Sequence, residues 1–101
     1  MAKLITIYWR DIPAQVVGRQ GRLNAKKELE PRFAKAIDRA AMRAGRGSSD
    51  AYLEDWRRET EMVSGDLEEL VASRVAKLEN EFDDEYLESV VKAGGVAGDV
   101  R

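Results

Sequence analysis

Four basic side chains are the first candidates for a chemical role in this sequence. Arg32, Lys35, Arg39 and Arg43 follow one another at intervals of 3, 4 and 4 residues, which places them on one face of a helix. At 100° per residue, their mean direction lies roughly 125° from the apolar face of the same segment, so we expect the stripe to face solvent. Such a stripe can bind an acidic protein or a nucleic-acid backbone. The simpler interpretation is a solvated helix face, paired in part with the chain's own acids.

The stripe belongs to a strongly basic half of the chain. Residues 1–46 carry eleven Lys/Arg and four Asp/Glu, a net charge of +7, whereas residues 47–101 carry six and fifteen, a net charge of −9. The whole chain has a charge of −2 and a pI near 5.2, far below the value of about 9 that is typical of nucleic-acid-binding domains. We therefore expect an acidic partner protein, or a second copy bound head to tail, with nucleic acid as the alternative.

An aromatic residue near the N-terminus is the second candidate for partner binding. Tyr8 and Trp9 are adjacent in a β-branched and aromatic segment, so on a strand they point to opposite faces. A core on one face of the sheet can therefore bury only one of the two side chains. The other must be covered by a second layer of the same protein or by a partner. Because tryptophan is enriched as an anchor at protein interfaces, we expect Trp9 to contact the partner.

Two further patterns have structural explanations that we favour. The segment from Gly18 to Arg22 contains a GxxG pattern like the phosphate-clamping loop of KH domains, but it follows a strand, so a plain turn is the better interpretation. The acidic run from Glu79 to Glu85 could bind Mg²⁺ or Ca²⁺, but it has no calcium-loop pattern and no glycine to turn a loop. Capping of a helix by Asp83 explains much of the acidic run. We expect neither a metal nor another cofactor.

The composition argues against most enzyme chemistry. The chain has no His and no Cys, which excludes a serine triad of the usual kind, a thiol nucleophile, a thiolate zinc site and disulfides. Two carboxylates, or a Lys–Tyr pair, could still act as acid and base, although no spacing singles out such a pair. A small enzyme subunit that uses carboxylates is therefore the second alternative, and an exposed groove with two convergent acids would support it.

The patterning predicts an α+β fold with a small antiparallel sheet covered by helices on one side. The elements that we expect are strands over 4–9 and 14–19, a loop marked by Gly18, Gly21 and Asn24, and helices over 31–44, 52–56, 66–81 and 83–93. Residues 57–63 either extend the helical turn before them or form a third strand. We favour the strand, because a lone hairpin is only marginally stable. Since the first strand does not alternate cleanly, both of its faces are expected to be largely covered.

The expected organisation is one α+β domain over residues 1–95 with a frayed tail over 96–101. The apolar run at 4–9 is too short for a signal peptide, and no stretch approaches the ~18 apolar residues of a membrane span. We therefore expect a cytoplasmic protein.

Three segments resemble a known family. They are Ile-Thr-Ile-Tyr-Trp-Arg-Asp-Ile-Pro-Ala-Gln-Val-Val at 5–17, Leu-Glu-Pro-Arg-Phe-Ala-Lys-Ala-Ile-Asp-Arg-Ala-Ala-Met at 29–42 and Ser-Asp-Ala-Tyr-Leu-Glu-Asp-Trp-Arg-Arg at 49–58. In this order they are similar to the small bacterial domain family labelled "virulence factor", and to a segment of the larger conserved virulence factor C. The resemblance covers about residues 3–85 and gives no catalytic or ligand-binding residues to map.

The resemblance implies a non-enzymatic accessory protein. Stand-alone members tend to be encoded near corrinoid- and folate-dependent methyl-transfer enzymes, which implies a role in one-carbon metabolism. No part of this chain resembles a cobalamin-binding His motif, so the chain is not expected to hold the corrinoid itself.

Overall fold

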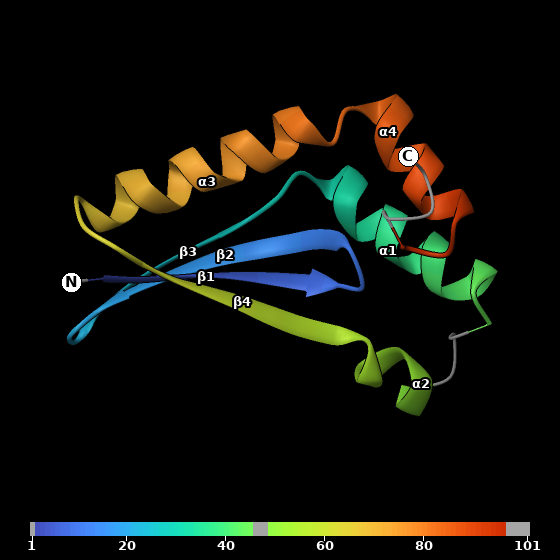
Figure 1. Ribbon diagram of the computed structural model, residues 1–101, viewed down its shortest axis with the longest axis horizontal. Helices are drawn as coiled ribbons and strands as arrows, with labels where there is room; N and C mark the ends of the chain where they lie inside the picture. Colours follow the sequence, from blue (N-terminus) through green and yellow to red (C-terminus); the bar gives the residue numbers. More distant parts are fainter. Residues whose placement is uncertain (1, 46–48, 97–101) are drawn as a thin grey trace.

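The described residues, 2–45 and 49–96, form a four-stranded antiparallel sheet and four helices in the computed structural model (Figure 1). The elements in chain order are β1 (Ala2–Trp9), β2 (Ile12–Gln20), β3 (Leu23–Glu28), α1 (Pro31–Arg43), α2 (Ser49–Glu54), β4 (Trp56–Val63), α3 (Leu67–Glu81) and α4 (Asp84–Lys92). The strand order is β3-β2-β1-β4, so β1 lies in the interior and β3 and β4 form the edges. The predicted α+β class is confirmed, and so is the strand at 57–63, which is β4.

The prediction of a loop around Gly21 and Asn24 is wrong for residues 23–28, which form the edge strand β3. Only Gly21 and Arg22 separate β2 from β3, since Gln20 is paired with Leu23. Gly21 has a φ of 59°, the left-handed conformation that a tight turn favours and that glycine adopts without strain. The Asn, Lys and Glu side chains of β3 are poor strand formers, but they are tolerated here because an exposed edge requires no burial.

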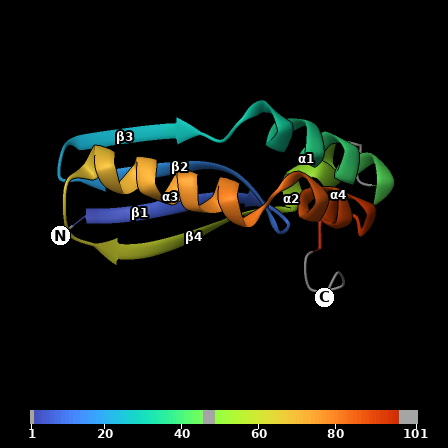
Figure 2. The same ribbon diagram turned by 90° about the horizontal axis from the view of Figure 1, so that it is seen from above.

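Helix α3 covers one face of the sheet (Figure 2). Leu4 and Gly18 are paired across β1 and β2 on the face that α3 covers, and both are buried. A Cβ atom at Gly18 would lie 2.7 Å from Leu67 Cδ1 and 2.8 Å from Val71 Cγ2, closer than side-chain carbons can approach. Glycine at this position therefore sets how closely α3 lies on β2.

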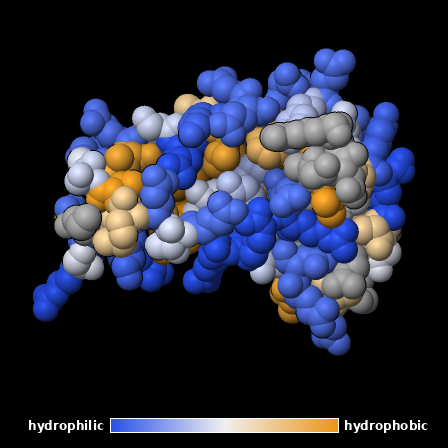
Figure 3. All heavy atoms as spheres, in the orientation of Figure 1, coloured by the Kyte–Doolittle hydropathy of each residue, from blue (hydrophilic) through white to orange (hydrophobic). Residues whose placement is uncertain are grey.

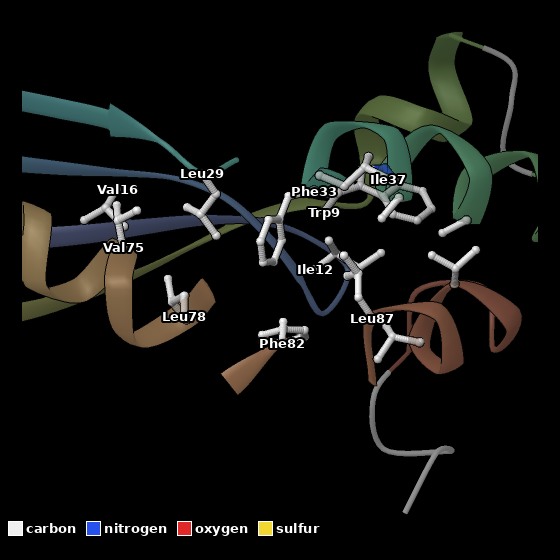
Figure 4. Close-up of a cluster of buried hydrophobic side chains, with 14 of the residues drawn as sticks. Trp9, Ile12, Val16, Leu29, Phe33, Ile37, Val75, Leu78, Phe82 and Leu87 are labelled. Atoms are coloured by element: carbon white, nitrogen blue, oxygen red, sulfur yellow. The ribbon is translucent and has the colours of Figure 1, made fainter. Parts of the chain in front are cut away.

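The core continues beyond the end of the sheet, where α1 packs on α4 and on the end of β2. Phe33 of α1 meets Phe82 edge to face, with ring centroids 6.1 Å apart. Ile37 of α1 and Leu87 of α4 belong to the same buried cluster (Figure 4). The Ala-rich face of α1 therefore packs mainly against a helix, and only its edge meets the sheet.

Aspartate side chains cap the starts of α3 and α4, and the cap at Asp83 is one that the sequence predicts. The Asp66 carboxylate accepts a hydrogen bond from the Glu69 N–H at 3.0 Å, and the Asp83 carboxylate accepts one from the Tyr86 N–H at 2.8 Å. Pro31 occupies the first turn of α1, where its missing N–H is not needed. Val96 is the last described residue, so the predicted frayed tail lies almost wholly outside the described residues, and the single-domain boundary stays a prediction.

A cluster of hydrogen bonds joins the β1–β2 turn to distant parts of the chain. The Arg10 N–H donates to the Asp55 carbonyl at 2.9 Å, and its guanidinium donates to the Asp55 carboxylate at 3.2 Å and to the Gly94 carbonyl at 3.0 Å. The Asp11 N–H donates to the Gly95 carbonyl at 2.8 Å. These contacts hold Arg10 at a φ of 54°, a conformation that costs a non-glycine residue about 1 kcal/mol.

Candidate functional site

The predicted basic stripe on α1 is divided by its contacts within the molecule. Arg39 forms a bidentate pair with the Glu88 carboxylate of α4, with both N–O distances 2.7 Å. Arg32 is half-buried and donates to the backbone carbonyls of Phe82 and Glu79, which join α1 to the end of α3. Arg32 and Arg39 are therefore engaged by other parts of the molecule, as the simpler interpretation of the stripe expects.

Lys35 and Arg43, the other two members of the stripe, are exposed and make no ion pair within the described part of the chain. Arg46, which would extend the stripe, lies outside the described residues. The partner-binding role of Arg32, Lys35, Arg39 and Arg43 stays a prediction, with only two of the four available without breaking an internal contact.

Trp9 is 0% exposed and has no surface to offer a partner. Its indole N–H donates to the Tyr52 carbonyl at 2.9 Å, and its ring stacks on Tyr52 with centroids 5.9 Å apart. Tyr8 lies on the other side of the sheet, beneath the guanidinium of Arg57 at 4.3 Å. The second layer that Trp9 requires is thus supplied by α2 of the same chain, and this removes the reason for expecting an anchor residue there.

The two secondary patterns have structural roles. Gly18 lies within β2 against α3 and Gly21 lies in the β2–β3 turn, so the GxxG segment is a hairpin. In the acidic run, Asp83 caps α4, and the Glu79 carboxylate accepts a hydrogen bond from the Glu30 N–H at 2.9 Å. Among the described residues, no group of three or more acidic side chains is arranged to hold a metal ion.

The sheet face opposite α3 emerges as a candidate surface that the sequence did not single out. We call it the open face. The strand register and the alternation of side chains place on it Lys3, Ile5 and Ile7 of β1, Gln15, Val17 and Arg19 of β2, Asn24, Lys26 and Glu28 of β3, and Arg58, Thr60 and Met62 of β4. At one end of this face lies α2, which covers Trp9 (Figure 1).

The centre of the open face is aliphatic. Ile5, Ile7 and Val17 are half-buried, and none of them belongs to the buried core or packs against it. Met62 beside them is 53% exposed. The first strand is thus largely covered on both faces, as predicted, although Ile5 and Ile7 keep part of their surface accessible.

Four cations surround the aliphatic centre. Lys3, Arg19, Lys26 and Arg58 are all exposed, and none forms an ion pair with another described residue. Glu28 is the single carboxylate on this face, so its side chains sum to a net charge of +3. An apolar centre with a cationic rim resembles a protein interface, in which the centre supplies affinity and the rim supplies complementarity.

The open face is less suited to single-stranded nucleic acid. Proteins that bind single strands stack the bases on aromatic side chains along the groove. The centre of this face is aliphatic, and the nearest aromatic ring of the same strand parity, that of Trp56, lies at the end beside α2.

Three comparisons with known proteins bear on the chain's identity. A family model described as "Virulence factor" matches residues 7–91, most of the chain. No curated protein matches the chain, and no solved structure does either. Within the described residues, no helix is long and apolar enough to cross a membrane. Because the family match spans β1 to α4, the chain belongs to the Virulence factor family.

Proposed function

We propose that this domain is a non-enzymatic interaction module that docks onto an acidic surface of a larger protein through its open face. The observation that carries this proposal is the position of Ile5, Ile7 and Val17, which lie outside the core within a ring of unpaired cations. Only Glu28 opposes the positive charge of this face, so the partner surface that complements it is acidic at its rim and apolar at its centre.

The two parts of the open face have different physical roles in this proposal. Covering the minor part of one such side chain that is still exposed contributes about 0.5 kcal/mol, so several aliphatic side chains together determine how long the complex lasts. The cations act mainly before contact, because a charged rim raises the rate of encounter and its effect falls with salt.

The family resemblance indicates which partners to test first. Its stand-alone members are encoded near corrinoid- and folate-dependent methyl-transfer enzymes, so we propose an accessory role beside an enzyme of one-carbon metabolism. The domain would then contribute a contact surface and leave cofactor and chemistry to its partner.

Association kinetics with two charge-reversed variants test the proposal. The first variant, Lys3→Glu/Arg58→Glu, alters the open face, and the second, Lys35→Glu/Arg43→Glu, alters the exposed half of the α1 stripe by the same amount of charge. The partner is obtained by affinity purification from the native cell, and its association rate is then measured at low and at physiological salt. We expect the open-face variant to associate at least about tenfold more slowly at low salt, and the α1 variant to stay within about twofold of wild type.

Three results would contradict the proposal. Equal association rates for wild type and Lys3→Glu/Arg58→Glu would remove the open face from binding. A loss confined to Lys35→Glu/Arg43→Glu would assign binding to α1. Tight binding to RNA or DNA with a steep logarithmic salt dependence would favour the nucleic-acid alternative.

A further inference from the structure

A hollow of about 270 Å³ lies at the end of the open face, where α1 and α2 meet β2 and β3. Five of its lining residues carry polar or aromatic groups, namely Gln15, Glu28, Asp38, Tyr52 and Trp56. The remaining wall is aliphatic and comes from Ala14, Leu29, Ala34 and Ile37. In the space-filling view the outline of the molecule is indented beneath the sheet, beside the projection that contains α2 (Figure 3). We call this site the aromatic hollow.

Two aromatic rings form perpendicular walls of the aromatic hollow. The ring centroids of Tyr52 and Trp56 are 5.7 Å apart and their planes make an angle of 85°. Both residues are half-buried and line the aromatic hollow, although the Tyr52 ring also stacks on Trp9. The face of an aromatic ring attracts an organic cation, and adjacent rings at an angle are the arrangement found in ammonium-binding aromatic cages.

The charge of the aromatic hollow has the sign that such a ligand requires. Glu28 and Asp38 both line it, no Lys or Arg does, and neither carboxylate forms an ion pair with another residue in the described ranges. Burial raises the pKa of the Tyr52 hydroxyl, and the negative charge of Asp38 raises it further, so the field of Asp38 extends to the aromatic wall.

We propose that the aromatic hollow binds an organic cation, an alkylammonium or alkylguanidinium group whose alkyl chain lies on the aliphatic wall. The ligand's charge is opposite to that of the partner surface expected at the open face, so cation binding is a function distinct from the docking proposed above, although the aromatic hollow shares Gln15 and Glu28 with the open face. The cation can come from a free amine or from a Lys or Arg side chain, and the chemistry is the same in both cases.

The two indole N–H groups provide a direct test by nuclear magnetic resonance. Trp56 lines the aromatic hollow, whereas the buried Trp9 indole touches it only through Tyr52, so the Trp56 signal should shift more than the Trp9 signal, and the backbone N–H signals of α3, on the other face of the sheet, are the internal control. We expect n-butylammonium and n-butylguanidinium to shift the Trp56 signal saturably, with a dissociation constant on the order of 1 mM. Neutral n-butanol is the matched ligand without charge and should bind at least about tenfold more weakly.

The variant Glu28→Gln/Asp38→Asn removes the charge and preserves the shape of the aromatic hollow. We expect it to weaken n-butylammonium binding by about tenfold and to leave n-butanol binding unchanged. Chemical shifts outside the aromatic hollow report whether the variant is folded. A matched surface control, Glu68→Gln/Glu69→Gln on α3, should bind the cation like wild type.

A blocked tripeptide with a central lysine separates the two sources of the cation. Binding of both the tripeptide and n-butylammonium supports capture of a side chain, and binding of the amine alone supports a free small molecule. The proposal would be overturned if n-butanol bound as tightly as the cation, if the charge-removed variant bound like wild type, or if the Trp56 signal did not respond up to about 50 mM amine.

Discussion

The two faces of the sheet treat the same kind of residue in opposite ways. Outside the open face, five arginines are bonded to carboxylates or carbonyls of other parts of the chain, namely Arg10, Arg32, Arg39, Arg57 and Arg74, whereas Arg43 is not paired among the described residues. On the open face, Lys3, Arg19, Lys26 and Arg58 have no such partner among the described residues. The separation of charge along the sequence therefore says less about function than the side of the sheet on which each cation lies.

Arg57 and Arg58 show the contrast within two adjacent residues. Arg57 donates to the Arg10 carbonyl at 2.7 Å and to the Asp11 carboxylate at 3.1 Å, and it lies over the ring of Tyr8. Arg58 points the other way, onto the open face beside Ile7. Within β4, strand parity thus separates an arginine that is bonded inside the molecule from one that is not.

The largest change in the free energy of unfolding is expected at Gly18, where β2 and α3 are in closest contact. Replacing Gly18 by valine places a side chain against Leu67 and Val71, so we expect a loss of about 3 kcal/mol in the free energy of unfolding, measured by urea denaturation. The neighbouring change Val17→Thr, on the open face, should alter it by less than about 0.5 kcal/mol. Similar losses at both positions would show that the open face is part of the core.

The next effect concerns Arg10, whose side chain joins the hairpin turn to Asp55 and Gly94. We expect Arg10→Ala to lower the free energy of unfolding by about 2 kcal/mol, because two partly buried hydrogen bonds are lost. Arg10→Gly removes the same bonds but relieves the positive φ, and should be about 1 kcal/mol less destabilising than Arg10→Ala. Arg19→Ala on the open face is the control, and an equal loss there would contradict the contrast between the faces.

A smaller effect should separate the adjacent arginines. Arg57→Ala removes hydrogen bonds to Arg10 and Asp11 and should lower the free energy of unfolding by about 1 kcal/mol. Arg58→Ala should leave stability within about 0.5 kcal/mol of wild type, while slowing association with an acidic partner. A stability loss for Arg58→Ala as large as that for Arg57→Ala would assign Arg58 a structural role.

The smallest effect is electrostatic and appears only in acid. The hydrogen bond from Arg39, together with its positive charge, holds the pKa of the Glu88 carboxyl below its ordinary value of 4.5. A lowered pKa in the folded state stabilises the fold above pH 4.5, and this contribution is lost as the pH falls through the lowered value. We expect Arg39→Met to raise the pKa of Glu88 toward 4.5 in a carbon-detected titration. The Glu61 carboxyl, whose pKa is lowered by Arg74, should keep its value in the same variant.

Most of the fold could be predicted because its signals are local. The caps at Asp66 and Asp83 and the β-branched run of β1 act within a few residues, so they can be identified without tertiary structure. β3 was missed because an exposed edge strand needs no apolar pattern, and its residues are those that also occur in loops.

The candidate surface was harder to predict because it depends on distant pairings. Arg39 is paired with Glu88, which lies 49 residues later in the chain, so its pairing could not be predicted from nearby residues. The partial exposure of Ile5 and Ile7 could not be predicted, because hydropathy does not distinguish a strand face that packs in the core from one that is only partly covered. The aromatic hollow joins residues of α1, α2, β2, β3 and β4, which are too far apart in the sequence to be recognised as one site.

The bonds between the first turn and the last described helix constrain how this molecule can be assembled. Arg10 reaches Gly94 across 84 residues, and the ring of Trp9 lies so close to Gly95 that a Cβ there would be 2.9 Å from it. The β1–β2 turn thus cannot form its bonds to Gly94 and Gly95 until the segment after α4 is present and folded against it. A shortened version that ends before Gly94 is therefore expected to lack these bonds and to be less stable, although it keeps all four strands.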